Sequence, residues 1–360
     1  MKILFILELY YPNIGGIEKL FKSLAEKLVY EGNTVTIITT RFRKDLPLKE
    51  TINGVRIKRL RISSRFVFTF FGIFGMLKEA RRCDIIHTTS YNAAFPARLA
   101  GLLARKKVII TFHEAWGNLW FSLPFAGSVS KRMYFLYEWF ILRLGFHRYI
   151  AVSDYTAGCL IRQGVKKHKV IRIYNGLDYS DFEPGDHTPP DNFTFTYFGR
   201  LGISKGLDLI PDAAAEFLKN HPDAHLKMII PQRPKGMYRK IRKLLKKIPA
   251  NRITLLHNLR DTDLRTELQH SSCIMIPSYS EGFCFAAAEA IAMGIPLISS
   301  GKGALAEVVC GKHITMESQD AEGLSEALEK AYAGDWEVTP VRRFDFDDTV
   351  GEYLKLYEGY

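Results

Sequence analysis

Short apolar runs alternate with helix-length amphipathic segments along almost the whole chain, and this alternation constrains the fold more than any other feature. Seven runs rich in Ile, Val and Phe lie at residues 2–7, 34–39, 55–60, 84–88, 107–112, 148–152 and 170–174. Five more follow at residues 193–198, 225–230, 253–256, 273–277 and 296–300. Because strands separated by helices form parallel sheets, each series predicts one α/β unit. A chain of 360 residues has room for two such domains.

The segment between the two series has the composition of a linker. It contains Pro184, Gly185, Pro189 and Pro190 within residues 177–192. We therefore expect an N-terminal domain at residues 1–176 and a C-terminal domain at residues 193–343, joined by this linker. Residues 344–360 form a separate final segment.

The two halves of the chain differ in charge. Residues 1–170 carry 28 Lys and Arg against 11 Asp and Glu, a net charge of +17, whereas the rest carries 22 against 27, a net charge of −5. A surplus confined to one half favours an anionic partner such as phosphate or lipid headgroups, with nucleic acid as the rival. The basic segment at residues 236–248 has an apolar stripe but no interleaved aromatic residues, which favours a solvated helix over a nucleic-acid site.

Cysteine usage and the N-terminus point to a reduced, cytosolic compartment. The five cysteines are scattered and show no spacing typical of metal ligands or of a disulfide framework. The N-terminal sequence has five apolar residues before Glu8, which we expect to be too short for a signal peptide or a membrane span.

Residues 66–77 (FVFTFFGIFGML) are apolar on every side and are flanked by Arg65, Lys78, Arg81 and Arg82. The segment is too short to cross a bilayer. Two interpretations stay open: it is part of the core, or it contacts a membrane surface.

Three motifs follow predicted strands. Gly15 and Gly16 precede a predicted helix, where a backbone free of side chains can approach an anion; a plain tight turn is the alternative. Arg200 and Lys205 follow the strand at residues 193–198, and two cations beside a helix N-terminus suit a diphosphate. A surface pair of cations is the alternative there.

The third motif is Glu281-Gly282-Phe283-Cys284, with Glu289 about two helical turns further on. It follows the strand at residues 273–277. A carboxylate can accept both hydroxyl groups of a sugar or ribose diol. Salt bridging or helix capping by the two glutamates is the structural alternative.

These motifs, with DIIHTTS at residues 84–90, HE at residues 113–114 and NGLD at residues 175–178, resemble glycosyltransferase family 4 nearly from end to end. The resemblance implies the GT-B fold, in which two Rossmann-like domains face each other across a cleft. It also implies that residues 344–360 form a C-terminal helix that crosses back to the N-terminal domain. The family usually has glycine at the position of Cys284.

The resemblance further implies a role for each site residue. Arg200 and Lys205 would hold the donor diphosphate and stabilise the departing charge, and Glu289 would bind the ribose. Glu281, with the amides of Gly282, Phe283 and Cys284, would hold the transferred sugar. His113 would reach the donor sugar, and Gly15 and Gly16 would let the first domain approach the phosphate.

We therefore expect a retaining glycosyltransferase that moves a sugar from a nucleoside-diphosphate sugar to a lipid-linked or cell-envelope saccharide. The retaining reaction that the resemblance implies requires no metal, and no cofactor is expected. The strings Asp261-Thr262-Asp263 and Asp345-Phe346-Asp347 lie at expected helix starts, where N-capping explains them. The expected location is the cytoplasm, at the cytoplasmic face of an anionic membrane, with nucleic acid an unfavoured partner. The alternatives are a nucleotide-sugar epimerase or hydrolase on the same fold, and a non-catalytic GT-B protein that binds membrane or nucleic acid.

Overall fold

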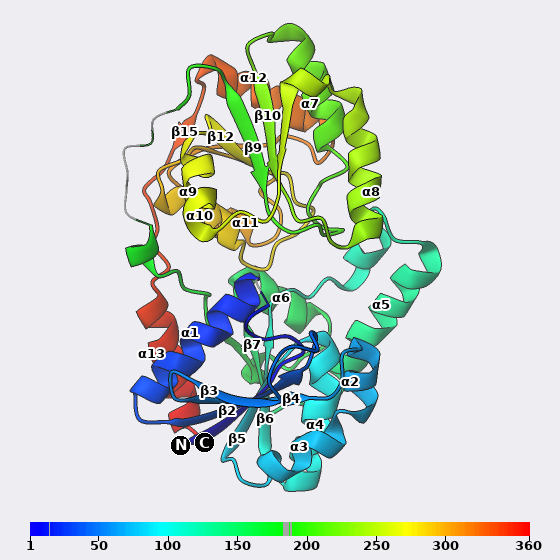
Figure 1. Cartoon of the computed structure of the whole chain (residues 1–360), viewed down its shortest axis with the longest axis vertical. Coiled ribbons are helices and arrows are strands. Elements are labelled where there is room, and N and C mark those ends of the chain that lie inside the picture. The colour runs from blue at the N-terminus through cyan, green and yellow to red at the C-terminus, as the bar shows by residue number, and fades with distance from the viewer. Residues whose placement is uncertain (14, 183–186, 188) are drawn as a thin grey trace. The chain divides into compact units, whose positions relative to one another are not determined.

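A computed structural model describes every residue of the chain except 14, 183–186 and 188. Contacts divide the chain into two compact units (Figure 1). The first unit comprises Met1–Trp120, Arg132–Gly176 and Phe344–Tyr360, and the second comprises Phe121–Lys131 and Leu177–Arg343. The linker expected at residues 177–192 lies partly outside the described residues. The domain limits expected from the sequence stay a prediction.

The first unit is built on one sheet with the strand order β3-β4-β2-β1-β5-β6-β7-β8. Only β3 runs antiparallel to its neighbour. The strands are β1 (Lys2–Ile6), β2 (Thr34–Thr40), β3 (Lys49–Ile52), β4 (Val55–Leu60), β5 (Ile85–Thr89), β6 (Lys107–Phe112), β7 (Arg148–Ala151) and β8 (Val170–Arg172). The helices are α1 (Gly16–Tyr30), α2 (Arg65–Phe71), α3 (Ile73–Ala80), α4 (Ala94–Ala104), α5 (Ser128–Leu142), α6 (Asp154–Arg162) and α13 (Phe346–Glu358). Of α5, the residues from Arg132 on belong to this unit.

The central strands of this sheet are apolar on both faces because helices cover both. Alternate residues of β1 enter two different core clusters: Leu4 and Ile6 pack with the group that contains α2 to α6, and Ile3 and Phe5 pack with α1 and α13. Strands buried on both faces form near-continuous apolar runs, which is the pattern that the sequence shows.

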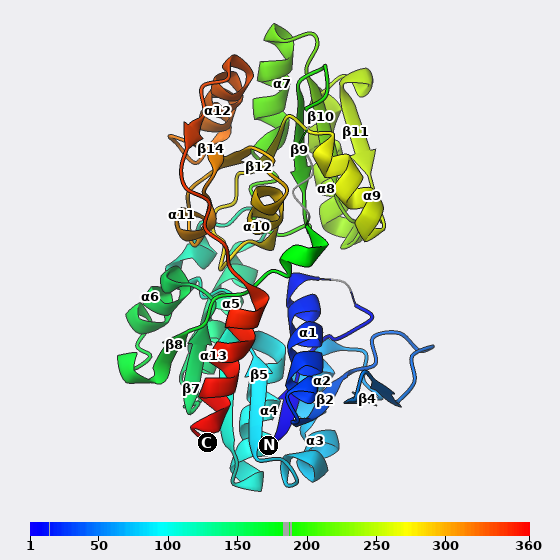
Figure 2. The ribbon, with the colours of Figure 1, turned by 90° about the vertical axis from the view of Figure 1, so that its left-hand side faces the viewer.

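Helix α13 is fastened to the first unit by a buried polar network. It lies beside α1 in both views (Figures 1 and 2). His87 Nδ1 is 2.6 Å from the hydroxyl of Tyr357, and His87 Nε2 is 2.8 Å from Thr111 Oγ1, which also lies 3.2 Å from the hydroxyl of Tyr353. Full burial, with a smaller contribution from the charge of His113, lowers the pKa of His87 to about 3. His87 is therefore neutral at physiological pH.

The second unit is built on a sheet with the order β11-β10-β9-β12-β13-β14-β15, in which only β15 is antiparallel. Its strands are β9 (Thr194–Phe198), β10 (His225–Ile229), β11 (Ile253–Leu256), β12 (Cys273–Ile276), β13 (Leu297–Ser299), β14 (Lys312–Thr315) and β15 (Glu337–Val338). Its helices are α7 (Ile210–Asn220), α8 (Lys235–Leu244), α9 (Asp261–Gln269), α10 (Phe285–Ala292), α11 (Leu305–Val308) and α12 (Ala321–Ala333).

The α/β class and both parallel sheets are confirmed, and all twelve apolar runs expected as strands overlap strands of the structure. The helix expected at residues 236–248 is α8 followed by a 3₁₀ turn at Leu245–Lys247. Its stripe packs inward through Ile241, Leu245 and Ile248, while its cations are exposed, as expected of a solvated helix.

Candidate functional site

Two loops of the second unit meet at the carboxyl ends of the neighbouring strands β9 and β12. Gly206 has a φ of +64°, and a Cβ at this position would lie 2.0 Å from the carbonyl oxygen of Pro277. The amide of Tyr279 also donates to the carbonyl of Ser204 at 2.7 Å. The loops therefore contact backbone to backbone, an approach that requires glycine at position 206.

This approach pairs Lys205 with Glu281. Lys205 Nζ lies 2.7 Å from Glu281 Oε2, and the hydroxyl of Ser278 donates to Glu281 Oε1 at 2.7 Å. Glu281 is 5% exposed, so both of its carboxylate oxygens are satisfied inside the protein. A buried carboxylate beside a lysine is charge-compensated, and an ammonium group with three donors can hold the carboxylate and a ligand at the same time.

The backbone of Glu281 is held as firmly as its side chain. Its carbonyl oxygen accepts from the amide of Ala304 at 2.9 Å. Gly303 has a φ of +67°, and a Cβ there would lie 2.5 Å from the same carbonyl. The loop that follows β13 thus fixes the position of the carboxylate.

A buried tyrosine shows that the charged residues of the site converge. Burial raises the pKa of Tyr197, while the charges of Lys205 and Arg200 lower it and that of Glu281 raises it. The hydroxyl of Tyr197 donates to the carbonyl of Arg200 at 3.3 Å, and the side chain of Arg200 is exposed at the end of β9. The charges of Arg200, Lys205 and Glu281 therefore all lie near the hydroxyl group of Tyr197.

Cys284 extends this convergence to Glu289. Burial raises the pKa of the Cys284 thiol well above its usual value; the charges of Glu281 and Glu289 raise it further, and that of Lys205 opposes them. Cys284 stands before α10 with a φ of +78°, a left-handed conformation that non-glycine residues adopt at a cost of about 1 kcal/mol. Phe283 is buried beside it, and Gly282 is buried too.

All the second-unit residues predicted from the sequence thus lie around one carboxyl edge, and their neighbours include polar residues that the sequence did not single out. The hydroxyl of Tyr279 donates to Asp208 Oδ2 at 2.7 Å. Within the described part of the chain, Asp208 Oδ1 and Ser280 Oγ are buried without a hydrogen-bond partner. Unsatisfied buried acceptors suit ligand hydroxyl groups. Their position in the loops after β9 and β12 was the signal that could have found them.

In the first unit, His113 directly follows β6, and its ring packs against Phe21 of α1 with the ring centres 6.0 Å apart. Gly15 and Gly16 stand at the start of the same helix. His113 and the two glycines therefore all lie next to α1: the glycines begin this helix, and the ring of His113 packs against it after β6, which lies beside β5 and β1 in the sheet.

A carboxylate of the protein itself occupies the N-terminus of α1. Glu18 is 9% exposed and accepts from Asn13 Nδ2 at 3.0 Å. A Cβ at Gly15 would lie 2.2 Å from Glu18 Oε2. The φ of Gly15 is −171°, an extended conformation open to any residue, so the absence of a side chain at Gly15 leaves room for the carboxylate of Glu18. Ile14 of this motif lies outside the described residues.

A second buried carboxylate, Glu138 of α5, organises the loop after His113 and was not predicted. It accepts from the amides of Trp116 and Gly117 at 3.1 and 2.6 Å, from Trp120 Nε1 at 3.1 Å and from the hydroxyl of Tyr91 at 2.9 Å. Four neutral donors compensate a carboxylate that is completely buried. From sequence, the signal was one acid among the apolar and aromatic residues that make up α5 from Met133 to Leu142.

Among residues outside positions 14, 183–186 and 188, no three His, Cys, Asp or Glu side chains converge in a way that could hold a metal ion. Of the two D-x-D strings, Asp345 caps α13 by accepting from the amide of Asp347, and Asp263 pairs with Arg260 at 2.8 Å. Metal-independent chemistry stays a prediction.

Comparison with known proteins agrees with this geometry. Residues 14–181 match Glycosyltransferase Family 4, and residues 181–341 match Glycosyl transferases group 1. A phosphatidylinositol N-acetylglucosaminyltransferase subunit of Homo sapiens is 25% identical over 91% of this chain and 68% of that protein. GDP-mannose:cellobiosyl-diphosphopolyprenol alpha-mannosyltransferase of Xanthomonas oryzae pv. oryzae is 26% identical over 99% of this chain and 96% of that protein.

Sucrose-phosphate synthase of Thermosynechococcus elongatus has a TM-score of 0.79 at 21% identity, over 99% of this chain and 98% of that one, and shares the GT-B fold. The two family matches run in order along the chain and meet at residue 181. The chain therefore belongs to the GT4-type glycosyltransferases of the GT-B fold.

Proposed function

We propose that this enzyme transfers a sugar, with retention of anomeric configuration and without a metal ion, from a nucleoside-diphosphate sugar to a lipid-linked or cell-envelope saccharide. The observation that carries the proposal is the convergence of two cations and two carboxylates at one edge of the second sheet. Cations suit the diphosphate, and carboxylates suit sugar hydroxyl groups.

In this proposal Arg200 and Lys205 bind the diphosphate and stabilise the negative charge that develops as it leaves. Each charge-assisted hydrogen bond contributes about 1.5–3 kcal/mol. Lys205 keeps Glu281 as a partner while it binds the phosphate, so the ammonium is already oriented before the donor arrives.

The carboxylates hold the two sugars of the donor. Glu289, which rises from the first turns of α10, accepts from the ribose hydroxyl groups. Glu281 and the amides of Gly282, Phe283 and Cys284 hold the transferred sugar. Because Ser278 and Lys205 fix the carboxylate of Glu281, its orientation is set in the free enzyme.

In a retaining transfer the acceptor attacks from the face that the diphosphate leaves, and the leaving phosphate takes the acceptor proton. Positioning and leaving-group electrostatics then supply most of the rate. His113 contributes from the first unit by contacting the donor sugar, and Gly15 and Gly16 allow the backbone to approach the phosphate once Glu18 yields that space.

The acceptor class rests on the curated relatives. One is named for phosphatidylinositol and another for a diphosphopolyprenol acceptor and a GDP-mannose donor. We propose a lipid-linked acceptor for this chain as well, which places the enzyme at the cytoplasmic face of a membrane. The described helices include none that is both long and apolar enough to span a bilayer.

The test incubates the purified chain with a panel of UDP- and GDP-sugars, a lipid-linked acceptor and EDTA, and identifies the products by mass spectrometry and NMR. Transfer in EDTA, with the anomeric configuration of the donor kept, is the expected result. A new nucleotide sugar without a glycosylated acceptor indicates an epimerase, and free sugar indicates a hydrolase. Absence of nucleotide-sugar binding by calorimetry indicates a non-catalytic protein.

A further inference from the structure

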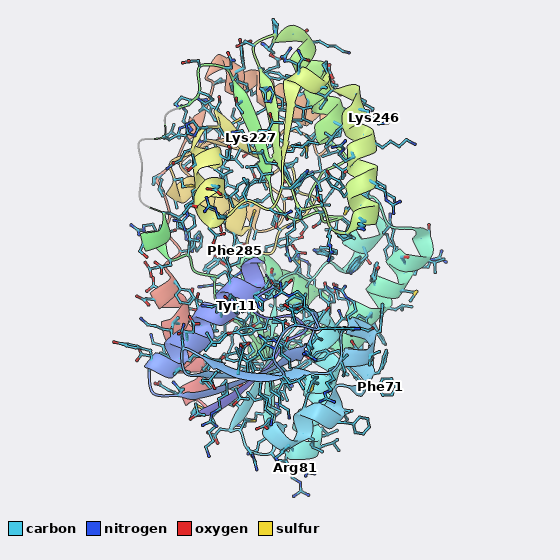
Figure 3. The ribbon with its side chains drawn as sticks, viewed as in Figure 1. Tyr11, Phe71, Arg81, Lys227, Lys246 and Phe285 are labelled. Carbon is cyan, nitrogen blue, oxygen red and sulfur yellow. The ribbon has the colours of Figure 1, made fainter. Side chains whose placement is uncertain are left out.

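The apolar segment at residues 66–77 is divided between core and solvent. Phe68, Ile73 and Met76 of α2 and α3 are buried in the core of the first unit. Four phenylalanines on the other side of these helices are exposed: Phe66 (68%), Phe70 (60%), Phe71 (61%) and Phe74 (84%). Figure 3 shows Phe71 on the outer side of α2. The interpretation as core therefore holds for one side of the segment, and the other side is exposed to solvent.

Helix α5 exposes a second row of large apolar side chains. Met133, Leu136, Trp139 and Phe140 are all at least 40% exposed. Phe95 of α4 connects the two rows, because its ring centre lies 6.3 Å from that of Phe70 and 5.8 Å from that of Phe140. The four phenylalanines of α2 and α3 and these four side chains of α5 thus belong to two rows that meet at Phe95, and together we call them the apolar face.

An exposed apolar surface of this kind marks an interaction site, because a soluble monomer seldom leaves many large side chains together in water. These side chains contribute little to the packing of the first unit. Phe74, for example, is 84% exposed. The apolar face consequently predicts a partner.

The exposed charged side chains of α2, α3 and α5 are cations. Exposed cations stand at both of its ends: Lys78, Arg81 and Arg82 on and after α3, and Arg132 and Arg143 on and after α5. Figure 3 shows Arg81 projecting from the end of α3. The guanidinium of Arg143 stacks on the ring of Trp139 at 4.0 Å.

No carboxylate of α2, α3 or α5, all of whose residues the structure describes, is exposed beside these cations. Glu138 is completely buried, and Glu79 is half-buried with Lys58 Nζ 3.8 Å away. The partner must therefore be apolar at its centre and negatively charged at its rim.

We propose that the apolar face docks on an anionic lipid bilayer, with its phenylalanines and Trp139 inserted among the acyl chains and its arginines and lysine at the headgroups. Aromatic side chains favour the membrane–water boundary, and each Lys or Arg gains attraction from anionic lipids. A second copy of this chain fits less well, since a twofold contact would bring the same cations together. None of these side chains is among those proposed to bind the donor.

The experiment is sedimentation of the full chain with vesicles of phosphatidylcholine alone or with 30% phosphatidylglycerol, at two salt concentrations. We expect binding to the anionic vesicles that weakens with salt. Phe71→Ser with Phe74→Ser, and separately Arg81→Glu with Arg82→Glu, should each raise the lipid concentration for half-binding at least about tenfold. Leu136→Ser with Met133→Ser repeats the apolar test on α5, should the first pair lower the melting temperature.

Two control pairs match these changes elsewhere. Val338→Ser with Val341→Ser removes exposed apolar side chains of the second unit, and Lys243→Glu with Lys246→Glu reverses two exposed charges of α8 and the turn after it. Both should leave binding within about twofold. Equal binding to neutral vesicles, an equal loss in the α8 variant, or a dimer that only the face variants dissociate would each overturn the proposal.

A nucleotide-binding measurement keeps this proposal apart from the proposed function. Stabilisation by a nucleoside diphosphate in a thermal-shift assay should be the same in the wild type and in every face variant. A variant that loses vesicle binding but keeps nucleotide binding tests the docking proposal alone. If the wild type binds no nucleotide, the proposed sugar transfer fails, and the vesicle result still decides the docking proposal.

Discussion

Glu138 of the first unit and Glu281 of the second are both buried carboxylates, yet their partners differ in kind. Glu138 accepts only from uncharged donors of its own unit, and all of them belong to the loop after β6 or to Tyr91. Glu281 pairs with the ammonium group of Lys205, which we propose also binds the donor diphosphate. The first arrangement can only hold a loop in place, whereas the second can exchange partners with a substrate. Burial of an acid therefore identifies a site only when its partner can act on a ligand as well.

The first unit should respond to acid more strongly than the second, because it buries His87 in the neutral form. Unfolded, this histidine has a pKa near 6.5, and folded it has a pKa of about 3. Above pH 6.5 both states are neutral. As the pH falls below 6.5 the unfolded state binds a proton that the folded state does not, so stability falls by up to about 1.4 kcal/mol per pH unit, or about 4 kcal/mol by pH 3.

Urea unfolding of the wild type and of His87→Gln between pH 4 and pH 8 checks this expectation. The two stability curves should approach each other as the pH is lowered. Parallel curves would show that the imidazole titrates normally in the folded protein. The first unit would then have no added sensitivity to acid from His87.

Glu138→Ala should cost about 3 kcal/mol of unfolding free energy, since it leaves several buried donors without an acceptor. The emission of Trp116 and Trp120 should shift to longer wavelength as the loop loosens. Glu352→Ala is the matched control: its carboxylate makes only a half-exposed ion pair with Arg172, worth less than about 1 kcal/mol. An equal loss of unfolding free energy in the two variants would contradict the role of Glu138 in holding the loop after β6.

Arg200→Ala and Glu289→Ala should each lower donor-dependent turnover at least ~100-fold, which corresponds to about 2.7 kcal/mol of transition-state stabilisation. Their melting temperatures should change little, because Arg200 is exposed and Glu289 only half-buried. The exposed residues Arg242 and Glu326 provide alanine controls with the same charge changes. Turnover at the wild-type rate in both site variants would refute the site.

Cys284→Gly should have the smallest effect and the opposite sign on stability. Glycine adopts a φ of +78° without strain, so the substitution should raise the unfolding free energy by about 1 kcal/mol. The packing that the buried thiol contributes is lost and must be subtracted from this gain. The informative measurement is the preference among donor sugars, since this residue stands between Glu281 and Glu289 in the loop that would hold the sugar. An unchanged preference with unchanged stability would mean that the side chain at position 284 does not shape the site.

Much of the architecture was predictable because buried parallel strands are continuous apolar runs. Three strands escaped the prediction, and each lies at or next to a sheet edge: β3, β14 and β15. Edge strands are short and half-solvated, so β3 (KETI) and β15 (EV) lack the apolar run that identifies a central strand. Both run antiparallel to the neighbouring strand, β3 to β4 and β15 to β14, and so fall outside the alternation of strand and helix that predicts a parallel sheet.

The candidate site was predictable to the level of its loops. Lys205 and Glu281 are 76 residues apart, and only the adjacency of β9 and β12 makes them a pair. Asp208 and Ser280 escaped notice because nothing in a linear sequence marks which polar atoms lack a partner after folding.

By itself the sequence determined two parallel α/β units, the loops that carry the charged residues, and the cationic character of the first half, because these follow from residue type and spacing. The tertiary structure alone decided which face of residues 66–77 is exposed to solvent. It also decided that Phe95 of α4 joins this face to α5, and that Glu138 holds the loop after β6. The physical reason is that burial and hydrogen-bond partnership depend on neighbours distant along the chain, whereas strand and helix patterns are local.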